Sequence, residues 1–183
     1  MRDTLSGEKV TIRAHMPAHV APLFAAVEES ISDLAPYETW CHPGYTKTEA
    51  AEYVDWWRQS WEKGRAHYFA IECSSTGDYL GSCGLSELLK EHKRASMGFW
   101  LRSSRTGEGL ATDAARMVAR FGFEDLGLER IEIESAVHNA ASRRIAEKLG
   151  AKLEGILRKR LILPTGPTDT AMYSLMRDSN ASV

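Results

Sequence analysis

The order of strand-like and helix-like segments constrains the fold of this chain more than any other feature. Strand patterns occur in three successive segments, residues 67–73, 79–85 and 95–101. Turn residues at 74–78 predict a hairpin between the first two. The following segments alternate, with a helix at 109–126, a strand at 130–137 and a helix at 140–149. An antiparallel meander leading into a β-α-β unit predicts an α/β fold with helices flanking one mixed sheet.

The two ends of the chain extend this arrangement. Residues 9–15 alternate as an opening strand, and Pro17 is expected to begin a helix. A loop is expected at 33–45. Two closing strands are expected at 152–163 and 170–176. Repeats and linkers are not evident, so the sequence predicts a single domain over residues 1–183.

A second helix is expected between the loop and the first strand of the meander. Thr46 or Thr48 would cap its start, and Gly64 would cap its end. Three tryptophans, Trp56, Trp57 and Trp61, are expected on its buried stripe, the alternative being a substrate pocket.

The composition is that of an ordinary globular domain. Basic residues number 23 and acidic residues 25, so the net charge of -2 does not favour nucleic acid or an anionic membrane as a partner. The apolar runs are too short to span a bilayer, and the first residues lack the apolar core of a signal peptide. The sequence therefore predicts a cytoplasmic protein.

Cysteine and histidine spacing does not predict a metal site. The three cysteines, Cys41, Cys73 and Cys83, form no Cys-x-x-Cys pair and are expected to stay reduced. The six histidines show no ligand spacing such as His-Glu-x-x-His. We expect no metal cofactor.

The segment from Trp100 to Thr112 carries the first chemical signal. A strand ends, Gly107 and Gly109 permit a tight turn, and a helix begins at once. Such a turn presents backbone N–H groups and the positive end of a helix dipole to an anion, for which a pyrophosphate is the natural ligand. Thr112 replaces the third glycine of a Gly-x-Gly-x-x-Gly motif, and no Gly-Lys-Ser/Thr follows. A helix entry without a ligand would explain this turn equally well.

A second signal follows the strand at 130–137. The chain continues as His138-Asn139-Ala140-Ala141-Ser142, and the next helix ends in Leu149-Gly150-Ala151. Together the two segments resemble the GNAT superfamily of N-acetyltransferases, in particular the branch of the ribosomal-protein alanine and serine N-acetyltransferases. That family's Gln/Arg-x-x-Gly-x-Gly/Ala loop is matched by Gly109 and Ala111, and its Asn-x-x-Ala/Ser and Leu-Gly motifs by Asn139, Ser142 and Leu149-Gly150.

The resemblance implies that acetyl-CoA is bound and that its acetyl group passes directly to an amine. In the family, the pantetheine arm lies in a V-shaped gap between two parallel strands and pairs with the first, implying main-chain contacts from Phe99, Trp100 and Leu101. It also implies pyrophosphate contacts from the N–H groups of Arg105, Thr106, Gly107, Glu108, Gly109, Leu110 and Ala111. Asn139 would form the far wall of the gap, and it also suits the N-cap of the next helix.

Two positions depart from the family pattern. Thr106 stands at the loop's leading Gln/Arg, with Arg105 just before it, and we expect binding to persist because backbone donors dominate. Ala146 stands where many members carry a tyrosine that protonates the departing thiolate. Ser142 is the nearest hydroxyl and the candidate for that role, unless it serves only in the first turn of the helix.

The sequence leaves the general base open. Ser96 and residues 158–161 occupy positions where relatives carry a glutamate. His138 is a candidate because an unperturbed imidazole exchanges a proton near neutrality. Three carboxylates compete with it, those of Glu38, Glu87 and Glu134. Alignment of amine and thioester could also supply much of the acceleration.

Three residues are candidates for binding the amine acceptor. Trp40 is a large aromatic residue in a loop, and Glu38 and Glu87 are carboxylates. The resemblance suggests the N-terminal amine of a protein, possible alternatives being a small amine, an antibiotic or a succinyl-CoA donor. A CoA-binding or partner-binding module without catalysis is a reading of another class, which turnover of acetyl-CoA would exclude. The family also suggests a homodimer.

Overall fold

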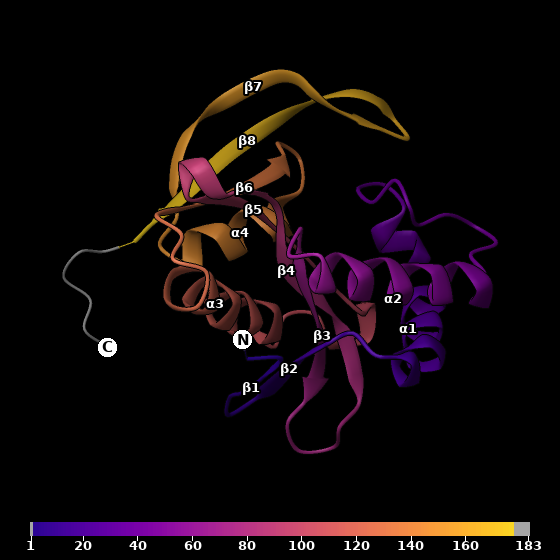
Figure 1. Ribbon diagram of the computed structural model, residues 1–183. Helices are drawn as coiled ribbons and strands as arrows, with labels where there is room; N and C mark the ends of the chain where they lie inside the picture. Colours follow the sequence, from indigo (N-terminus) through magenta and orange to yellow (C-terminus); the bar gives the residue numbers. More distant parts are fainter. Residues whose placement is uncertain (1, 178–183) are drawn as a thin grey trace.

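The computed structural model describes residues 2–177, which form one eight-stranded sheet with helices on both faces (Figure 1). The strands are β1 (Thr4–Ser6), β2 (Val10–Ala14), β3 (His67–Cys73), β4 (Tyr79–Leu89), β5 (Arg94–Leu101), β6 (Arg130–Ala136), β7 (Lys152–Leu163) and β8 (Gly166–Met176). The α-helices are α1 (Val20–Leu34), α2 (Lys47–Glu62), α3 (Leu110–Glu124) and α4 (Ala140–Lys148). Short 3-10 turns are η1 (Pro17–His19), η2 (Lys90–His92) and η3 (Ser103–Arg105).

The strands lie in the order β1-β2-β3-β4-β5-β6-β8-β7. All neighbours are antiparallel except β5 and β6, which run parallel and are joined by the crossover helix α3. The predicted mixed sheet, with a meander that leads into a β-α-β unit, is therefore confirmed. The β7–β8 hairpin curves away from the rest of the sheet at its far edge (Figure 1).

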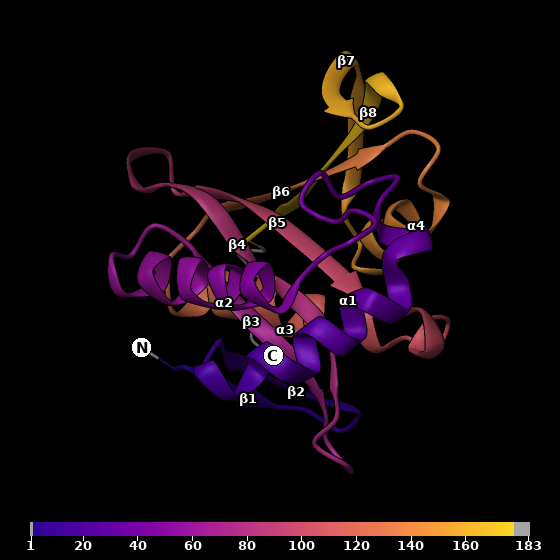
Figure 2. The same ribbon diagram turned by 90° about the vertical axis from the view of Figure 1, so that its right-hand side faces the viewer.

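The helices divide between the two faces of the sheet. Helices α1 and α2 lie on one face and α3 lies behind the sheet on the other (Figure 2). The apolar stripe of α3 includes Ala114, Val118 and Phe121, which are fully buried against the sheet. Gly122 allows close packing there, because a Cβ atom at this position would lie 2.9 Å from Leu85 Cδ1.

Helix α2 begins with a reciprocal cap. The Thr46 hydroxyl accepts a hydrogen bond from the Glu49 N–H at 3.2 Å, and the Glu49 carboxylate accepts one from the Thr46 N–H at 2.8 Å. This capping box satisfies two backbone donors that the first turn would otherwise leave free. Thr46, rather than Thr48, is therefore the cap.

Several predicted boundaries differ from the structure. The three-residue strand β1 is too short to show a pattern in the sequence. Strand β8 begins at Gly166, four residues before the expected start, because the Gly-Pro pair at its beginning is typical of a turn and hides the strand in the sequence. Pro17 opens a 3-10 turn, and the α-helix that follows reaches Leu34, inside the expected loop. Trp56 is 62% exposed, so the expectation that it belongs to the buried stripe of α2 is wrong. Its side chain projects from a helix that is covered by the sheet on the opposite side only.

Candidate active site

The parallel strands β5 and β6 part soon after they begin. Only three residue pairs join them, Arg94 with Arg130, Ala95 with Ile131, and Ser96 with Glu132. Both strands continue beyond this point, because β4 pairs with β5 as far as Leu101 and β8 pairs with β6 as far as Ala136. Each strand is thus held on its outer side while the inner edges diverge. The backbone groups on those inner edges are available to a ligand that adds to the sheet.

A cavity of about 110 Å³ lies in this gap. Gly98 and Phe99 of β5 line one side, and residues 133–136 of β6 line the other. Asn139 and Ser142 close the end nearest α4, and Glu38 contributes from the segment that follows α1. Since a water molecule occupies about 30 Å³ of liquid, the cavity has room for a few water-sized groups.

The turn into α3 lies directly after β5. Gly107 and Gly109 have φ angles of +84° and +83°, which side-chain-bearing residues rarely adopt. No atom lies within 4 Å of a Cβ placed at either glycine, so the backbone conformation, not space, requires them. Among the described residues, the N–H groups of Gly107 through Ala111 have no hydrogen-bond acceptor. They form a row of free donors at the N-terminus of a 15-residue helix, which suits a phosphate group.

Two of the seven expected donors are engaged elsewhere. The Arg105 N–H donates to Arg102 O at 3.1 Å, and the Thr106 N–H donates to Ser103 O at 3.3 Å. Both bonds close the 3-10 turn η3, so the free row begins at Gly107. The Arg105 side chain pairs with Glu108 at 2.8 Å, and this pair neutralises the charge of both loop side chains.

Helix α1 anchors the start of this loop. Glu29 accepts hydrogen bonds from the Arg102 guanidinium and from the Ser104 N–H, the latter at 2.9 Å. The hydrogen bonds from Arg102, the largest cause, and from Ser104 lower the pKa of Glu29 to about 2, so the carboxylate stays charged. The Ser30 hydroxyl accepts from the Ser103 N–H at 2.9 Å. No sequence pattern points to these contacts, since the partners lie far apart in the chain.

The start of α4 places two of the predicted residues at the cavity. The Asn139 side chain accepts a hydrogen bond from the Ser142 N–H at 3.1 Å and is the N-cap. His138 is exposed, and its ring packs 5.5 Å from the Tyr37 ring, outside the cavity lining. Ala146 is fully buried, and as an alanine it gives α4 no hydroxyl at this position.

Trp100 and Leu101 lie beyond the cavity lining, although they continue the parted edge of β5. The Trp100 ring is buried and donates from Nε1 to the Tyr53 hydroxyl at 3.2 Å. Trp40 packs on it, with ring centroids 5.7 Å apart. Trp40 does not line the cavity either, so these rings belong to the core that α1 and α2 form beside the site.

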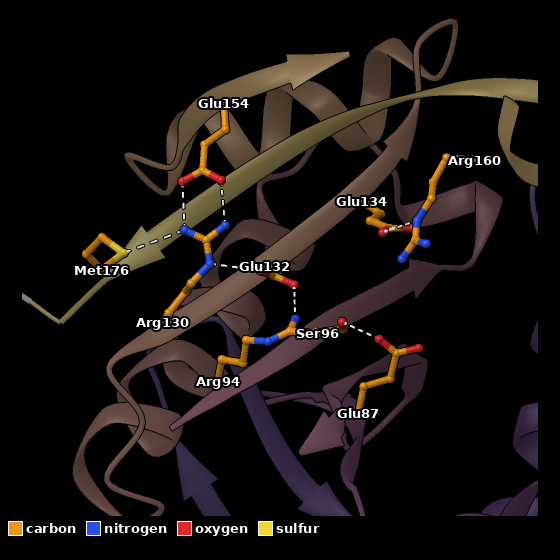
Figure 3. A network of polar contacts seen from close by, with 9 residues as sticks. All are labelled: Glu87, Arg94, Ser96, Arg130, Glu132, Glu134, Glu154, Arg160 and Met176. Atoms are coloured by element: carbon orange, nitrogen blue, oxygen red, sulfur yellow. Dashed lines mark hydrogen bonds and ion pairs between the residues drawn. The ribbon is translucent and has the colours of Figure 1, made fainter. Parts of the chain in front are cut away.

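The three carboxylates named from the sequence have different surroundings, and Figure 3 shows two of them, Glu87 and Glu134. Glu87 sits in a β-bulge with φ +50° and accepts from the Ser96 hydroxyl at 2.9 Å, and it does not line the cavity. Glu134 lines the cavity and pairs with Arg160 at 3.0 Å. Glu38 lines the cavity and has no ion pair within residues 2–177, and its carboxylate accepts from Trp40 Nε1 at 2.8 Å.

In the part of the chain that the structure describes, no group of three or more His, Cys, Asp or Glu side chains could hold a metal ion. None of the helices within residues 2–177 combines the length and the apolar character that crossing a membrane requires.

Comparison with known proteins identifies the family. The acetyltransferase (GNAT) domain matches residues 9–152. The N-acetyltransferase YoaA of Bacillus subtilis is 31% identical over 117 residues, 64% of this chain and 66% of that protein. The match thus spans slightly less than two thirds of that relative. The ribosomal-protein-serine acetyltransferase of Escherichia coli is 23% identical over 98% of this chain and 99% of its own length.

Solved structures share the fold over nearly the full chain. RimL, a ribosomal L7/L12 alpha-N-protein acetyltransferase solved with coenzyme A, has a TM-score of 0.90 at 21% identity and covers 97% of this chain and 99% of its own. The resemblance stated from the two sequence motifs is therefore confirmed. The chain belongs to the GNAT family of acetyltransferases.

Proposed function

We propose that this protein is an acetyl-CoA-dependent N-acetyltransferase that passes the acetyl group directly to a primary amine. One observation carries the proposal: the gap between β5 and β6 opens beside the free N–H groups of the turn into α3. The open strand edge can pair with a polar amide arm, and the free N–H groups that follow it can bind a pyrophosphate. The two features together fit an elongated ligand that carries both groups. Family membership and a CoA-bound structural neighbour support this assignment.

The donor would be held mainly by backbone. The N–H groups of Gly107, Glu108, Gly109, Leu110 and Ala111 would bind the pyrophosphate. The parted edge of β5, from Phe99 through Trp100 to Leu101, would pair with the pantetheine arm, and Asn139 would face it from α4. Arg105 and Thr106 would shape the loop through the η3 turn without donating their N–H groups.

The chemistry would proceed in one displacement. The amine nitrogen attacks the thioester carbonyl, which a backbone N–H of β5 would polarise. An N–C bond forms, the C–S bond breaks, and the amine loses one proton. Ser142 lines the cavity, and its hydroxyl would give a proton to the departing thiolate. His138 takes no part in this scheme because it lies outside the cavity.

The acceptor we propose is the N-terminal amine of a protein. Two relatives support this choice, a ribosomal-protein-serine acetyltransferase and an alpha-N-protein acetyltransferase. Glu38 would border the acceptor side of the cavity, Trp40 would support it through the hydrogen bond to its carboxylate, and Glu87 would stand at a greater distance along β4. We further propose a cytoplasmic location. We also propose a homodimer, which light scattering of the purified protein would test.

The proposal is tested by turnover. Purified protein is incubated with acetyl-CoA and short peptides that begin with Ser or Ala, and the free thiol and the peptide mass are followed. A thiol released in step with a peptide heavier by one acetyl group is the expected result. The double variant Asn139→Ala and Gly109→Val should bind CoA much more weakly than the wild type. Unchanged CoA affinity in this variant, or no acetyl transfer to any amine, would overturn the proposal.

A further inference from the structure

Glu38 is held firmly at the mouth of the cavity by its own backbone. The chain turns sharply at the end of α1, where the N–H groups of Tyr37 and Glu38 both donate to Leu34 O, at 2.9 and 2.8 Å. The Glu38 carbonyl then accepts from the Cys41 N–H at 3.0 Å. These bonds fix residues 37–41 against the end of the helix. The backbone position of Glu38 is thus set by local structure.

The Glu38 carboxylate has one engaged oxygen and one free oxygen. Oε2 accepts from Trp40 Nε1 at 2.8 Å, and the Trp40 ring is itself packed against Trp100 and Tyr53. Among the described residues no donor reaches Oε1. The residue lines the cavity together with Gly98, Phe99 and Ser142. Glu38 is therefore an oriented carboxylate with one free oxygen, and it lines the space where thioester and amine would meet.

The protonated, neutral form of the Glu38 carboxyl is more stable relative to the charged form in this site than it would be in water. Burial of the carboxyl raises its pKa to about 7, and the hydrogen bond from Trp40 opposes this rise. Burial moves the pKa values of the neighbouring thiol and phenols away from neutrality. Burial raises the pKa of Cys41 to about 11, with the Glu38 charge as a further cause, and the pKa values of Tyr53 and Tyr68 are also raised by burial. Among Glu38, Cys41, Tyr53 and Tyr68, Glu38 is thus the group that changes charge near pH 7.

The other carboxylates near the cavity are less suited to accept a proton. Glu134 lies across the cavity on β6 but is paired with Arg160 at 3.0 Å (Figure 3). Glu87 accepts from the Ser96 hydroxyl and stands outside the cavity lining. Glu134 is thus paired with a cation and Glu87 is held by a hydroxyl donor, whereas Glu38 Oε1 has no protein partner among the described residues.

We propose that Glu38 is the general base of the proposed acetyl transfer, with Trp40 as the residue that positions it. This inference rests on the proposed function. As the amine nitrogen bonds to the thioester carbon, one N–H proton passes to Glu38 Oε1. The proton then leaves to water through the cavity, since residue 38 as a whole is partly exposed although its carboxyl is buried. The sulfur departs with its electron pair and takes a proton from another donor, so charge and atoms balance.

The first test is the Glu38→Gln variant, with exposed Glu62→Gln as its matched control. Activity is measured as kcat/KM for acetyl-CoA and a Ser-initiated peptide across pH, and CoA binding and thermal unfolding report whether the fold persists. A positioned general base contributes roughly 10²–10⁴-fold, so Glu38→Gln should lose activity on that scale. Its profile should also lack the inflection near pH 7 while it keeps that of the peptide amine. The control should behave as the wild type.

A conservative Trp40→Phe variant gives an independent test in a protein that keeps its aromatic packing. It removes the N–H that lowers the pKa of Glu38, so the inflection should move to higher pH. A ¹³C NMR titration of the wild-type carboxyl should show the same group titrating near pH 7.

The outcomes separate this inference from the proposed function. Lack of turnover by the wild type with any amine would overturn both. A wild type that acetylates the peptide, together with a Glu38→Gln variant that keeps its rate and pH profile, would overturn the inference alone. An inflection that stays in place in Trp40→Phe, or a carboxyl that titrates in the ordinary acidic range, would also contradict it.

Discussion

Replacement of Gly109 by valine tests whether the turn into α3 binds the donor. The N-cap position has φ +83° and ψ 0°, and nothing lies within 4 Å of an added Cβ. The substitution therefore acts through the backbone and not through a clash. The left-handed region costs an L-residue about 1–2 kcal/mol, and a β-branched side chain is especially disfavoured there.

The valine variant can keep the strained positive φ, or the backbone can relax to a negative φ. Relaxation is favoured because the turn lies at the end of a helix. If the backbone moves to a negative φ, the free N–H groups of residues 107–111 lose their alignment, and CoA binding must restore it. The strain then appears as lost affinity, a factor of roughly 5–30 for 1–2 kcal/mol. We expect the dissociation constant of CoA to rise by at least that factor while the unfolding temperature changes little.

Gly127 supplies the matched control. It follows the other end of the same helix, has φ +65°, and likewise has no atom within 4 Å of an added Cβ. Gly127→Val should carry comparable backbone strain without any loss of CoA affinity. Isothermal titration calorimetry and thermal unfolding of both variants separate the two effects. Equal CoA affinities in the two variants would refute the assignment of the turn as the pyrophosphate site.

Three further predictions concern the cavity and the core. Ser142→Ala should lower kcat with little change in unfolding temperature, and a kcat equal to that of the wild type would exclude the hydroxyl as proton donor to the thiolate. Gly98→Ala should destabilise the protein by about 1–3 kcal/mol in chemical denaturation, because the new Cβ would lie 2.3 Å from the hydroxyl of Tyr68, and unchanged stability would contradict this packing. Burial lowers the pKa of His15 from 6.5 to about 3, so the unfolded chain binds the extra proton and stability falls as the pH drops below 6.5. This site should contribute a loss of about 2 kcal/mol between about pH 7 and about pH 5, and His15→Asn should reduce that dependence.

The sequence was sufficient for the β-α-β unit because its signals are local. Gly107 and Gly109 mark a turn that needs positive φ, and Asn139 caps α4 as its position before the helix suggested. The meander was also predicted from the sequence, by the alternation of apolar and polar residues in its strands and by the turn residues between them. Family motifs then identified the ligand class without knowledge of where the strands lie.

The shape of the site could not be read in the same way. The parting of β5 and β6 depends on pairing with β4 and β8, which are remote in sequence. Glu38 lies in an irregular segment, and its place at the cavity follows from the end of α1 and from tertiary packing. The anchoring of the loop by Glu29 joins residues that no local pattern relates. Contacts of this kind become visible only in the folded chain.

Calorimetric titration of the purified protein with acetyl-CoA tests the central claim most directly. Succinyl-CoA is the matched donor control, and ATP and NAD are the nucleotide controls. The account predicts saturable binding of acetyl-CoA that Gly109→Val weakens and Gly127→Val does not. Tighter binding of succinyl-CoA would keep the site and change the acyl group that is transferred. Absence of binding by either CoA ester would contradict the claim that the gap between β5 and β6 is a CoA site.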